Sequence, residues 1–270
     1  RRRPRSCSFF VSLFSLEEET DVTDNTTNIR EVVLDVLLEV LEKHNLSHIV
    51  LKQALEKYLF LERQDRAFIT RCVEGTLEYR IQIDAVLDRF SKVKTAKMKP
   101  VIREILRMSV YQILYMERVP DSAVCNEAVK LAKKRKFQGL SGFVNGVLRT
   151  VSREKGKLVW KDASERYSIP RWMLSMWEEM YGKETSETIA ASFLEERPLT
   201  VRFNESISPA EKTIGELRDQ GITVEKSGTF PGIASIRGFD YLDRVCAFTE
   251  GKITVQDPSS SLAAQMASIA

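Results

Sequence analysis

The sequence contains few residues of the kinds that bind metal ions or form disulfides. Its 270 residues include only 4 cysteines and 2 histidines. The cysteines, Cys7, Cys72, Cys125 and Cys246, form no Cys-X-X-Cys pair and show no metal-ligand spacing. This scarcity argues against both a disulfide scaffold and a zinc site, so we expect a protein of a reducing compartment, the cytoplasm.

The two histidines do not change this expectation. His44 and His48 have the four-residue spacing of a helical metal pair. Asn45-Leu46-Ser47 should break the helix between them, however, and no third ligand is evident. We therefore predict that the chain binds no metal ion.

Long apolar runs are also missing. The longest one near the start, residues 9–16, is far below the roughly 20 residues that span a bilayer. It follows four arginines, as a secretory signal would, but no small-residue cleavage site comes after it and the acidic residues 17–19 follow at once. We predict no membrane association, and we interpret residues 1–27 as a disordered tail or a non-native extension.

What the sequence does contain is typical of a globular protein, with 43% hydrophobic and 29% charged residues and a net charge of only +3. The positive charge is concentrated in two runs. One contains Lys92, Lys94, Lys97, Lys99, Arg103 and Arg107, and the other extends from Lys130 to Lys136. Such runs either form solvated surfaces, where cations at a helix end are favoured by the helix dipole, or contact phosphate groups.

The first half of the sequence has a helical hydrophobic period with short connections. Apolar residues recur at three- and four-residue intervals in residues 28–43, and Thr27 or Asn28 can cap this helix. Ser47 is expected to cap a second helix that extends to Tyr58. Further helices are expected at 62–79, 81–90, 100–117, 121–136 and 141–153, with Pro100 at a first helical position. The pattern predicts a single all-α domain over residues 28–155.

From residue 156 the pattern changes. Residues 167–177 are rich in aromatics and predict a turn and a buried helix, in which Trp172 and Trp177 form part of the core and do not stack on bases. Residues 199–204 alternate as a strand does, residues 210–220 follow as a helix and residues 222–224 as a strand, which is a βαβ pattern. Shorter strands are expected at 234–236 and 252–255. We interpret residues 156–254 as linker helices and a small α/β domain.

Several segments together resemble a known family. The capped helix at 119–133 and the short helix at 143–149 resemble the NusB family. Six segments occur in the order found in the RsmB (Sun, or Fmu) family of bacterial ribosomal RNA cytosine-C5 methyltransferases: residues 66–69, 119–133, 144–149, 166–172, 198–204 and 256–260. The resemblance implies a mainly α fold, in which a NusB-like, RNA-binding helical bundle precedes linker helices and a small α/β, RRM-like domain. Residues 255–270 would begin a methyltransferase domain whose remainder is absent from this sequence.

The chemistry of that family defines what this chain lacks. Carbon 5 of cytosine is a poor nucleophile, so these enzymes are understood to add a cysteine thiolate to carbon 6 before methyl transfer. Their cysteines follow proline, whereas the four here follow Ser6, Arg71, Val124 and Val245. The only glycine-rich stretch, residues 139–146, has the wrong spacing for a cofactor loop, and we expect its glycines to end one helix and pack closely against the next. We therefore predict no catalytic and no cofactor-binding residue here, and S-adenosylmethionine is implied only for the full-length protein.

The two basic runs are then the candidate RNA contacts. With the NusB resemblance, phosphate contact becomes the favoured interpretation of the helix-end run, and the interhelix run is a candidate extension of the same surface. The predicted RNA-binding residues are Lys133, Lys134, Arg135, Lys136, Lys92, Lys94, Lys97 and Lys99. Asn126, Glu127 and Asn145 are expected to form hydrogen bonds between helices. Arg149 either pairs with an acid or faces RNA.

Three functional hypotheses remain open. The preferred one is the RNA-binding, substrate-positioning part of an S-adenosylmethionine-dependent 16S ribosomal RNA methyltransferase, unable to transfer a methyl group as it stands. The second is a stand-alone, non-enzymatic NusB-like antitermination factor that binds RNA and a ribosomal protein, although such factors stop after the bundle. The third is a helical interaction scaffold. In the first case the helix from residue 259 should be poorly ordered or should expose Leu262, Met266 and Ile269.

Overall fold

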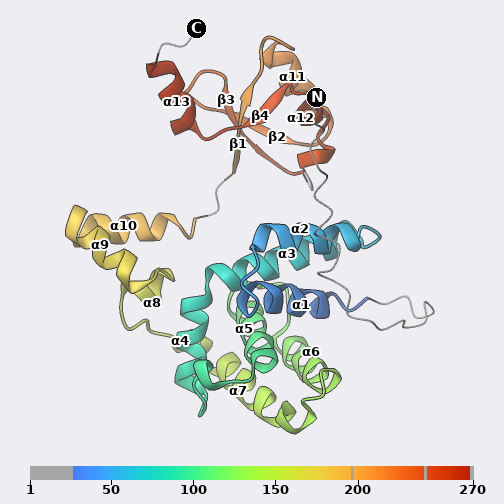
Figure 1. Ribbon diagram of the computed structural model, residues 1–270, viewed down its shortest axis with the longest axis vertical. Coiled ribbons are helices and arrows are strands. Elements are labelled where there is room, and N and C mark those ends of the chain that lie inside the picture. The colour runs from blue at the N-terminus through green and yellow to red at the C-terminus, as the bar shows by residue number, and fades with distance from the viewer. Residues whose placement is uncertain (1–26, 196–197, 240–241, 268–270) are drawn as a thin grey trace, which may run out of the picture.

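The computed structural model describes residues 27–195, 198–239 and 242–267, and it shows a helical bundle, a helical arm and a domain with a small sheet (Figure 1). The predicted mainly α fold with a small α/β domain is confirmed. Residues 1–26, which include Cys7, lie outside the described residues. Within the described part of the chain, no helix is long and apolar enough to cross a membrane.

The bundle contains the seven predicted helices. They are α1 (Ile29–Leu41), α2 (Ser47–Lys57), α3 (Arg63–Glu78), α4 (Arg80–Phe90), α5 (Pro100–Tyr115), α6 (Asp121–Lys134) and α7 (Ser141–Glu154). Asn28 caps α1 as expected, because its side chain accepts hydrogen bonds from the backbone N–H groups of Arg30 and Glu31. Ser47 is not a cap, since it is the first helical residue of α2 and no side chain caps that helix.

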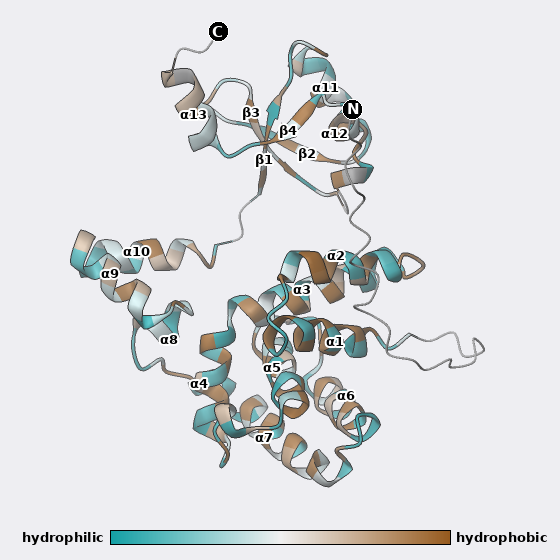
Figure 2. Ribbon diagram, viewed as in Figure 1, coloured by the Kyte–Doolittle hydropathy of each residue, from teal (hydrophilic) through white to brown (hydrophobic). Residues whose placement is uncertain are grey.

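Helix α5 forms the centre of the bundle. Every residue from Ile102 to Ile113 except Arg103 is buried, and α5 packs against α1, α3, α4, α6 and α7. The outer helices carry both apolar and polar residues, as Figure 2 shows, because each buries only one face. Helices α3 and α5 pack closely at Gly75, where a Cβ atom would lie 2.0 Å from the Tyr111 ring. The residue at position 75 must therefore lack a side chain.

The arm consists of α8 (Ala163–Tyr167), α9 (Arg171–Tyr181) and α10 (Lys183–Ser192). The arm is attached to the bundle through Ser168, the residue directly after α8. The Ser168 hydroxyl donates to the Glu78 carbonyl at 2.7 Å and accepts from the Ile81 N–H at 3.2 Å. Trp177 stacks on Phe193 with ring centroids 5.6 Å apart. The prediction that Trp172 is part of the core is wrong, because its side chain lies on the outer face of α9 and is 67% exposed.

The second domain has four strands and two short crossover helices. They are β1 (Leu199–Phe203), α11 (Ala210–Asp219), β2 (Thr223–Lys226), β3 (Ile233–Arg237), α12 (Cys246–Thr249) and β4 (Ile253–Val255), followed by α13 (Pro258–Met266). The strand order is β2-β3-β1-β4, and all neighbours are antiparallel. The predicted βαβ unit is thus of the split type, with β3 inserted between β1 and β2, which is the ferredoxin-like arrangement.

The sheet has one covered and one open face. Alternate residues of the strands, such as Val201, Ala234 and Ile236, pack with Ile214 and Leu217 of α11 in a small core. The other face presents mostly polar side chains. From the strand registers these are Thr200 and Arg202 of β1, Thr223 and Glu225 of β2, Ile233, Ser235 and Arg237 of β3, and Thr254 of β4. Helix α13 lies beside this sheet, with Leu262 41% and Met266 77% exposed, as predicted for these two residues, whereas Ile269 lies outside the described residues.

Candidate nucleic-acid interface

The end of helix α6 positions the first predicted basic cluster. Lys136 adopts a left-handed conformation with φ 65°, which lets the Phe137 N–H donate to the Ala132 carbonyl at 2.8 Å and the Lys136 N–H donate to the Lys133 carbonyl at 3.0 Å. This pair of bonds is a Schellman motif, and it ends the helix without a glycine. The positive charges therefore lie at the negative end of the helix dipole, where cations are favoured.

Two of the four cations in this cluster are paired with acids of α1. Arg135 lies 2.5 Å from the Asp35 carboxylate and 3.3 Å from that of Glu31, and Lys134 lies 2.5 Å from Glu31. Burial raises the pKa of the Asp35 carboxyl, and the opposing charge of Arg135 only partly offsets this. Lys134 and Arg135 thus hold α6 against α1, and much of their charge is compensated within the protein.

The other two cations of the cluster are directed to solvent. Lys133 and Lys136 are exposed. Within the described part of the chain, neither side chain has an ion pair or a hydrogen bond, so each can donate to a phosphate group without first breaking a contact. Of the predicted cluster, these two side chains are the ones that the fold leaves available.

The second predicted cluster lies on the connection between α4 and α5, where residues 95–97 form a 3-10 turn. Asp88 fixes this connection, because its carboxylate accepts from the Thr95 N–H at 2.7 Å and its backbone carbonyl accepts from Lys94 at 2.8 Å. Lys92, Lys97 and Lys99 are exposed. The structure thus leaves three cations of this run available, on a loop of defined shape.

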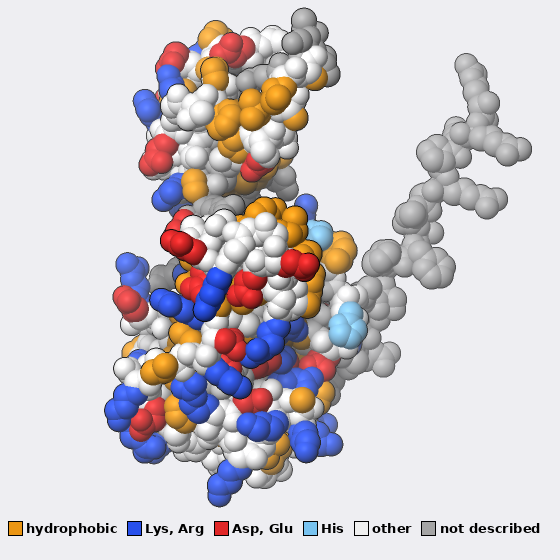
Figure 3. All heavy atoms as spheres, turned by 90° about the vertical axis from the view of Figure 1, so that its left-hand side faces the viewer, with side chains coloured by type: hydrophobic (Ala, Val, Ile, Leu, Met, Phe, Trp, Pro, Cys, Tyr) orange, Lys and Arg blue, Asp and Glu red, His pale blue; other side chains and the backbone are white. Residues whose placement is uncertain are grey.

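The two clusters are at different ends of helix α1. The α6 cluster pairs with Glu31, whereas Arg103, which directly follows the second cluster, pairs with Glu42 at 2.5 Å. Eleven residues of helix separate the two acids, which corresponds to about 16 Å. Figure 3 shows blue Lys and Arg side chains mixed with red Asp and Glu over the bundle, without a continuous positive patch on that face. The clusters are therefore separate sites of positive charge.

Arg103 and Arg107, which continue the second run in the sequence, are not part of this surface. Arg107 forms a bidentate pair with Asp84, at 2.7 Å for both bonds, and a third bond of 2.7 Å to Glu104. Glu104 is fully buried, and burial raises the pKa of its carboxyl to about 7. These residues form an internal ion-pair network that joins α4, α5 and the end of α1.

The polar residues of α6 and α7 differ from expectation. Glu127 bonds Lys130 of its own helix at 2.7 Å, and Asn145 accepts from Arg149 of its own helix at 3.1 Å. The expected hydrogen bonds between the helices are therefore wrong for these two residues, and none is found for the exposed Asn126 in the described part of the chain. Arg149 has no acidic partner among the described residues, and it is exposed.

The glycine-rich stretch, residues 139–146, covers part of the 3-10 turn at residues 138–140 and the first turns of α7. Gly142 and Gly146 therefore lie inside a helix, and the expectation that the stretch lies between helices is wrong for them. Its expected packing role is wrong, because no atom lies within 4 Å of a Cβ placed at Gly139, Gly142 or Gly146. Between residue 27 and this stretch the structure contains no strand, so the stretch does not follow a described strand as a dinucleotide- or S-adenosylmethionine-binding turn would.

The cysteines described by the structure do not form a reactive site. Cys72 and Cys125 are buried, and burial raises the pKa of both thiols, that of Cys72 to about 12. Cys246 is exposed on α12. Within the described ranges, no group of three or more His, Cys, Asp or Glu side chains could hold a metal ion.

Comparison with known proteins identifies both domains. Residues 27–153 match the NusB family, and residues 169–235 match the ferredoxin-like domain of RsmF/B-like methyltransferases. The predicted resemblance to RsmB proteins is confirmed. Because the chain continues from the NusB domain into this second domain, the findings favour the methyltransferase interpretation over the stand-alone antitermination factor.

Individual relatives agree with this assignment. The chain is 32% identical to a probable ribosomal RNA small subunit methyltransferase B of Bacillus subtilis, and the match covers 88% of this chain and 54% of that protein. A protein of the same description from Synechocystis is 28% identical, with coverages of 88% and 54%. A solved structure, that of PH0851, shares the fold with a TM-score of 0.65 at 21% identity, over 89% of this chain and 56% of that one. The chain thus spans about half the length of the curated relatives that it matches.

Proposed function

We propose that this chain holds small-subunit ribosomal RNA for a cytosine-C5 methyltransferase. The proposal rests on the fact that the chain joins a NusB-family domain to a ferredoxin-like domain of the RsmF/B type. The observation that carries the proposal is the order of the two domains, which matches that of ribosomal RNA small subunit methyltransferase B over 88% of the chain. The protein would act in the cytoplasm, with RNA as its partner.

The described residues would contribute binding and positioning. Lys133, Lys136, Lys92, Lys97 and Lys99 would donate to phosphate oxygens, which fixes an RNA without reading its sequence. S-adenosylmethionine would supply the methyl group in such an enzyme. The residues present do not fit this cofactor, because the glycine-rich stretch forms a 3-10 turn and the first turns of α7. Cys72 and Cys125 are not available as nucleophiles, because burial raises the pKa of both thiols. Methyl transfer is therefore not assigned to these residues.

A salt titration tests the proposal directly. A fluorescently labelled fragment of small-subunit ribosomal RNA should bind the chain with an affinity that falls steeply as salt concentration rises, because bound cations release counterions from the RNA. Each phosphate contact contributes about 0.7–0.9 to the slope of log affinity against log salt. Absence of binding even at low ionic strength would refute the proposal.

Matched variants locate the contacts. The double variant Lys133→Gln/Lys136→Gln should lower this slope by about 1.5, since it removes two phosphate contacts. The control Lys183→Gln/Lys212→Gln removes the same charge from α10 and α11, where both lysines are exposed, and should leave the slope within error of the wild type. An equal loss in both variants would show that net charge, and not the end of α6, attracts the RNA.

A further inference from the structure

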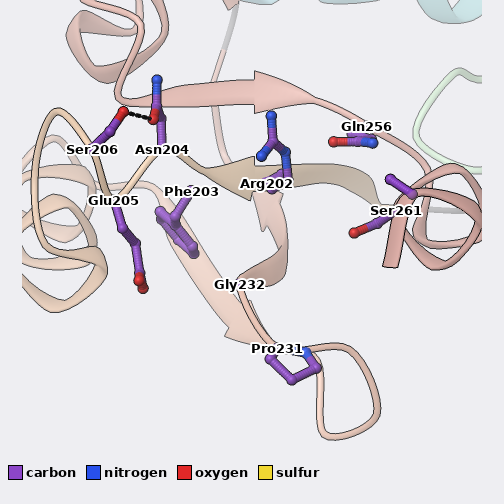
Figure 4. A pocket seen from close by; sticks show the side chains of 10 residues that line it. Arg202, Phe203, Asn204, Glu205, Ser206, Pro231, Gly232, Gln256 and Ser261 are labelled. Atoms are coloured by element: carbon purple, nitrogen blue, oxygen red, sulfur yellow. Dashed lines mark hydrogen bonds between the residues drawn. The ribbon is translucent and has the colours of Figure 1, made fainter. Parts of the chain in front are cut away.

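The open face of the ferredoxin-like domain contains a cavity that the basic clusters do not explain. It has a volume of about 630 Å³ and is bounded by the end of β1, the turn before β3 and helix α13 (Figure 4). Its polar lining includes Arg202 from β1, Gln256 directly after β4 and Ser261 of α13. Strand β1 and the segment that leads from β4 into α13, more than 50 residues later, thus both supply polar side chains to one cavity.

These three side chains are placed by the sheet. Arg202 pairs with Thr254 of β4, and the Gln256 N–H donates to the Thr200 carbonyl at 3.2 Å. Because side chains alternate along a strand, Arg202, Thr254 and Gln256 all lie on the open face. The end of β4 thereby carries the chain to α13, where Ser261 completes the cavity wall.

The polar groups of these side chains are available for a ligand. Within the described part of the chain, the Arg202 guanidinium has no ion pair and no hydrogen bond, although a guanidinium carries five donors. The Gln256 amide and the Ser261 hydroxyl also lack a side-chain hydrogen bond among the described residues, and Ser261 is only 5% exposed. A cation, an amide and a hydroxyl at one cavity form a donor set that suits an oxyanion.

The acidic group at this cavity lies away from these donors. Glu205 also lines the cavity. In Figure 4 its carboxylate points away from Arg202, beyond the Phe203 ring, whereas the Ser261 hydroxyl points toward the space beside Arg202. The donor end of the cavity therefore keeps its positive charge.

The composition of the open face determines the kind of contact. RRM-type sheets bind RNA by stacking bases on aromatic side chains of their central strands. The central strands here are β1 and β3, and their open-face residues are Thr200, Arg202, Ile233, Ser235 and Arg237. No aromatic side chain is present among them, so this face cannot hold bases by stacking.

We infer that this cavity binds a phosphate group of the RNA backbone, with Arg202 as the principal donor and Gln256 and Ser261 as neutral donors. The inference rests on the proposed function and deepens it, because it assigns to the ferredoxin-like domain a contact that is independent of base identity. The planar fork of Arg202 matches two phosphate oxygens, which a lysine ammonium cannot do.

The test uses the whole chain and two single-stranded probes, a labelled 12-nucleotide oligouridine and a labelled 12-nucleotide oligoadenosine. Arg202→Gln should weaken binding of both probes by the same factor, about tenfold, as expected for loss of a charge-assisted hydrogen-bonded pair. It should also lower the salt slope by about 0.7, which is one single-strand phosphate contact. Arg202→Lys should recover only part of the loss.

The matched control is Arg218→Gln, which removes an exposed arginine from α11 on the covered side of the same sheet. It should bind both probes as the wild type does. Equal effects of the two substitutions, an unchanged affinity of Arg202→Gln, or a loss confined to one probe would each overturn the inference while leaving RNA binding by the chain intact. A wild-type chain that binds neither probe nor the ribosomal RNA fragment would instead remove the proposed function.

Discussion

The helical bundle and the open sheet face use their cationic side chains in different ways. In the bundle, Arg107 and Arg135 each contact two carboxylates, and Arg103 also contacts two. On the open sheet face, Arg202 contacts no carboxylate among the described residues. The bundle contains more arginine and lysine than the open face, yet much of that charge is neutralised internally.

This difference shows that the pairing of a cation matters more for RNA contact than the number of cations in a sequence run. A guanidinium that is already bound to a carboxylate gains little from a phosphate, because one charged hydrogen bond is exchanged for another. An unpaired guanidinium gives up only hydrogen bonds to water when it binds a phosphate, so its net gain in binding free energy is larger. Substitutions that change packing, buried charge and surface charge one at a time separate these contributions.

The largest effect is expected from packing. Gly75→Ala places a Cβ atom 2.0 Å from the Tyr111 ring, which is itself only 1% exposed. We expect a loss of about 3 kcal/mol in the free energy of unfolding of the bundle, the upper part of the usual range for overpacking. Urea unfolding followed by far-ultraviolet circular dichroism measures it.

The control for this substitution is Gly146→Ala in α7, where no atom lies within 4 Å of the added carbon. This variant should gain about 0.5 kcal/mol, because alanine is the better helix former. If Gly75→Ala were as stable as Gly146→Ala, the tight contact between α3 and α5 would not exist in solution.

The sequence was sufficient to predict local features of both domains. The helical period defined all seven bundle helices, and the cap at Asn28 and the first-turn proline at Pro100 were correctly placed. These features depend on residues within one or two turns of each other, so a single sequence contains the information. The resemblance to NusB and RsmB proteins supplied the order of domains.

The features that could not be predicted from the sequence depend on residues far apart in it. The apolar neighbours of Trp172 in the sequence predict a core position for it. The side of α9 on which it lies is, however, not covered within the described part of the chain. The pairing of Arg135 with Asp35 spans 100 residues, and the cavity at Arg202 needs α13 as its third wall. Neither Arg202 nor Gln256 lies in a basic run, so the sequence alone does not indicate that either is a candidate contact.

The buried carboxyl of Glu104 should make the free energy of unfolding of the bundle depend on pH. Burial raises the pKa of Glu104 to about 7 from 4.5, so the folded chain retains a proton that the unfolded chain loses. Stability should therefore fall as pH rises from about 4.5 to 7, by up to about 3 kcal/mol for this group. Glu104→Gln removes the titration, and the difference between its urea midpoint and that of the wild type should change across this window.

The neighbouring acids make the difference measurement necessary. Burial also raises the pKa of Asp35 and Glu74, so both add to the same trend, whereas that of Glu42 is lowered because hydrogen bonds and charge from Arg103 outweigh its burial. Asp35 and Glu74 do not interact with Glu104, so their contributions cancel in the comparison. Glu42 is hydrogen-bonded to Glu104, so the comparison measures these two carboxyls together. Parallel pH profiles of the two proteins would show that Glu104 is ionised throughout.

The smallest effect separates the paired from the unpaired cations at the end of α6. Arg135→Gln leaves Asp35, whose pKa is already raised by burial, without its closest positive charge. We expect a loss of about 1–2 kcal/mol in the free energy of unfolding, between the values for exposed and buried ion pairs. Lys133→Gln, two positions away on the exposed side, should change it by less than about 0.5 kcal/mol.

Binding should show the reverse order. Lys133→Gln removes a cation that is free to contact phosphate, so it should weaken binding of the ribosomal RNA fragment and lower the salt slope by about 0.7–0.9. Arg135→Gln should have the smaller effect on binding at a temperature where both variants are folded, because its charge is already compensated by Glu31 and Asp35. If one substitution dominated both stability and binding, pairing with an acid would not prevent a cation from contacting RNA, and the distinction between the bundle and the sheet face would no longer hold.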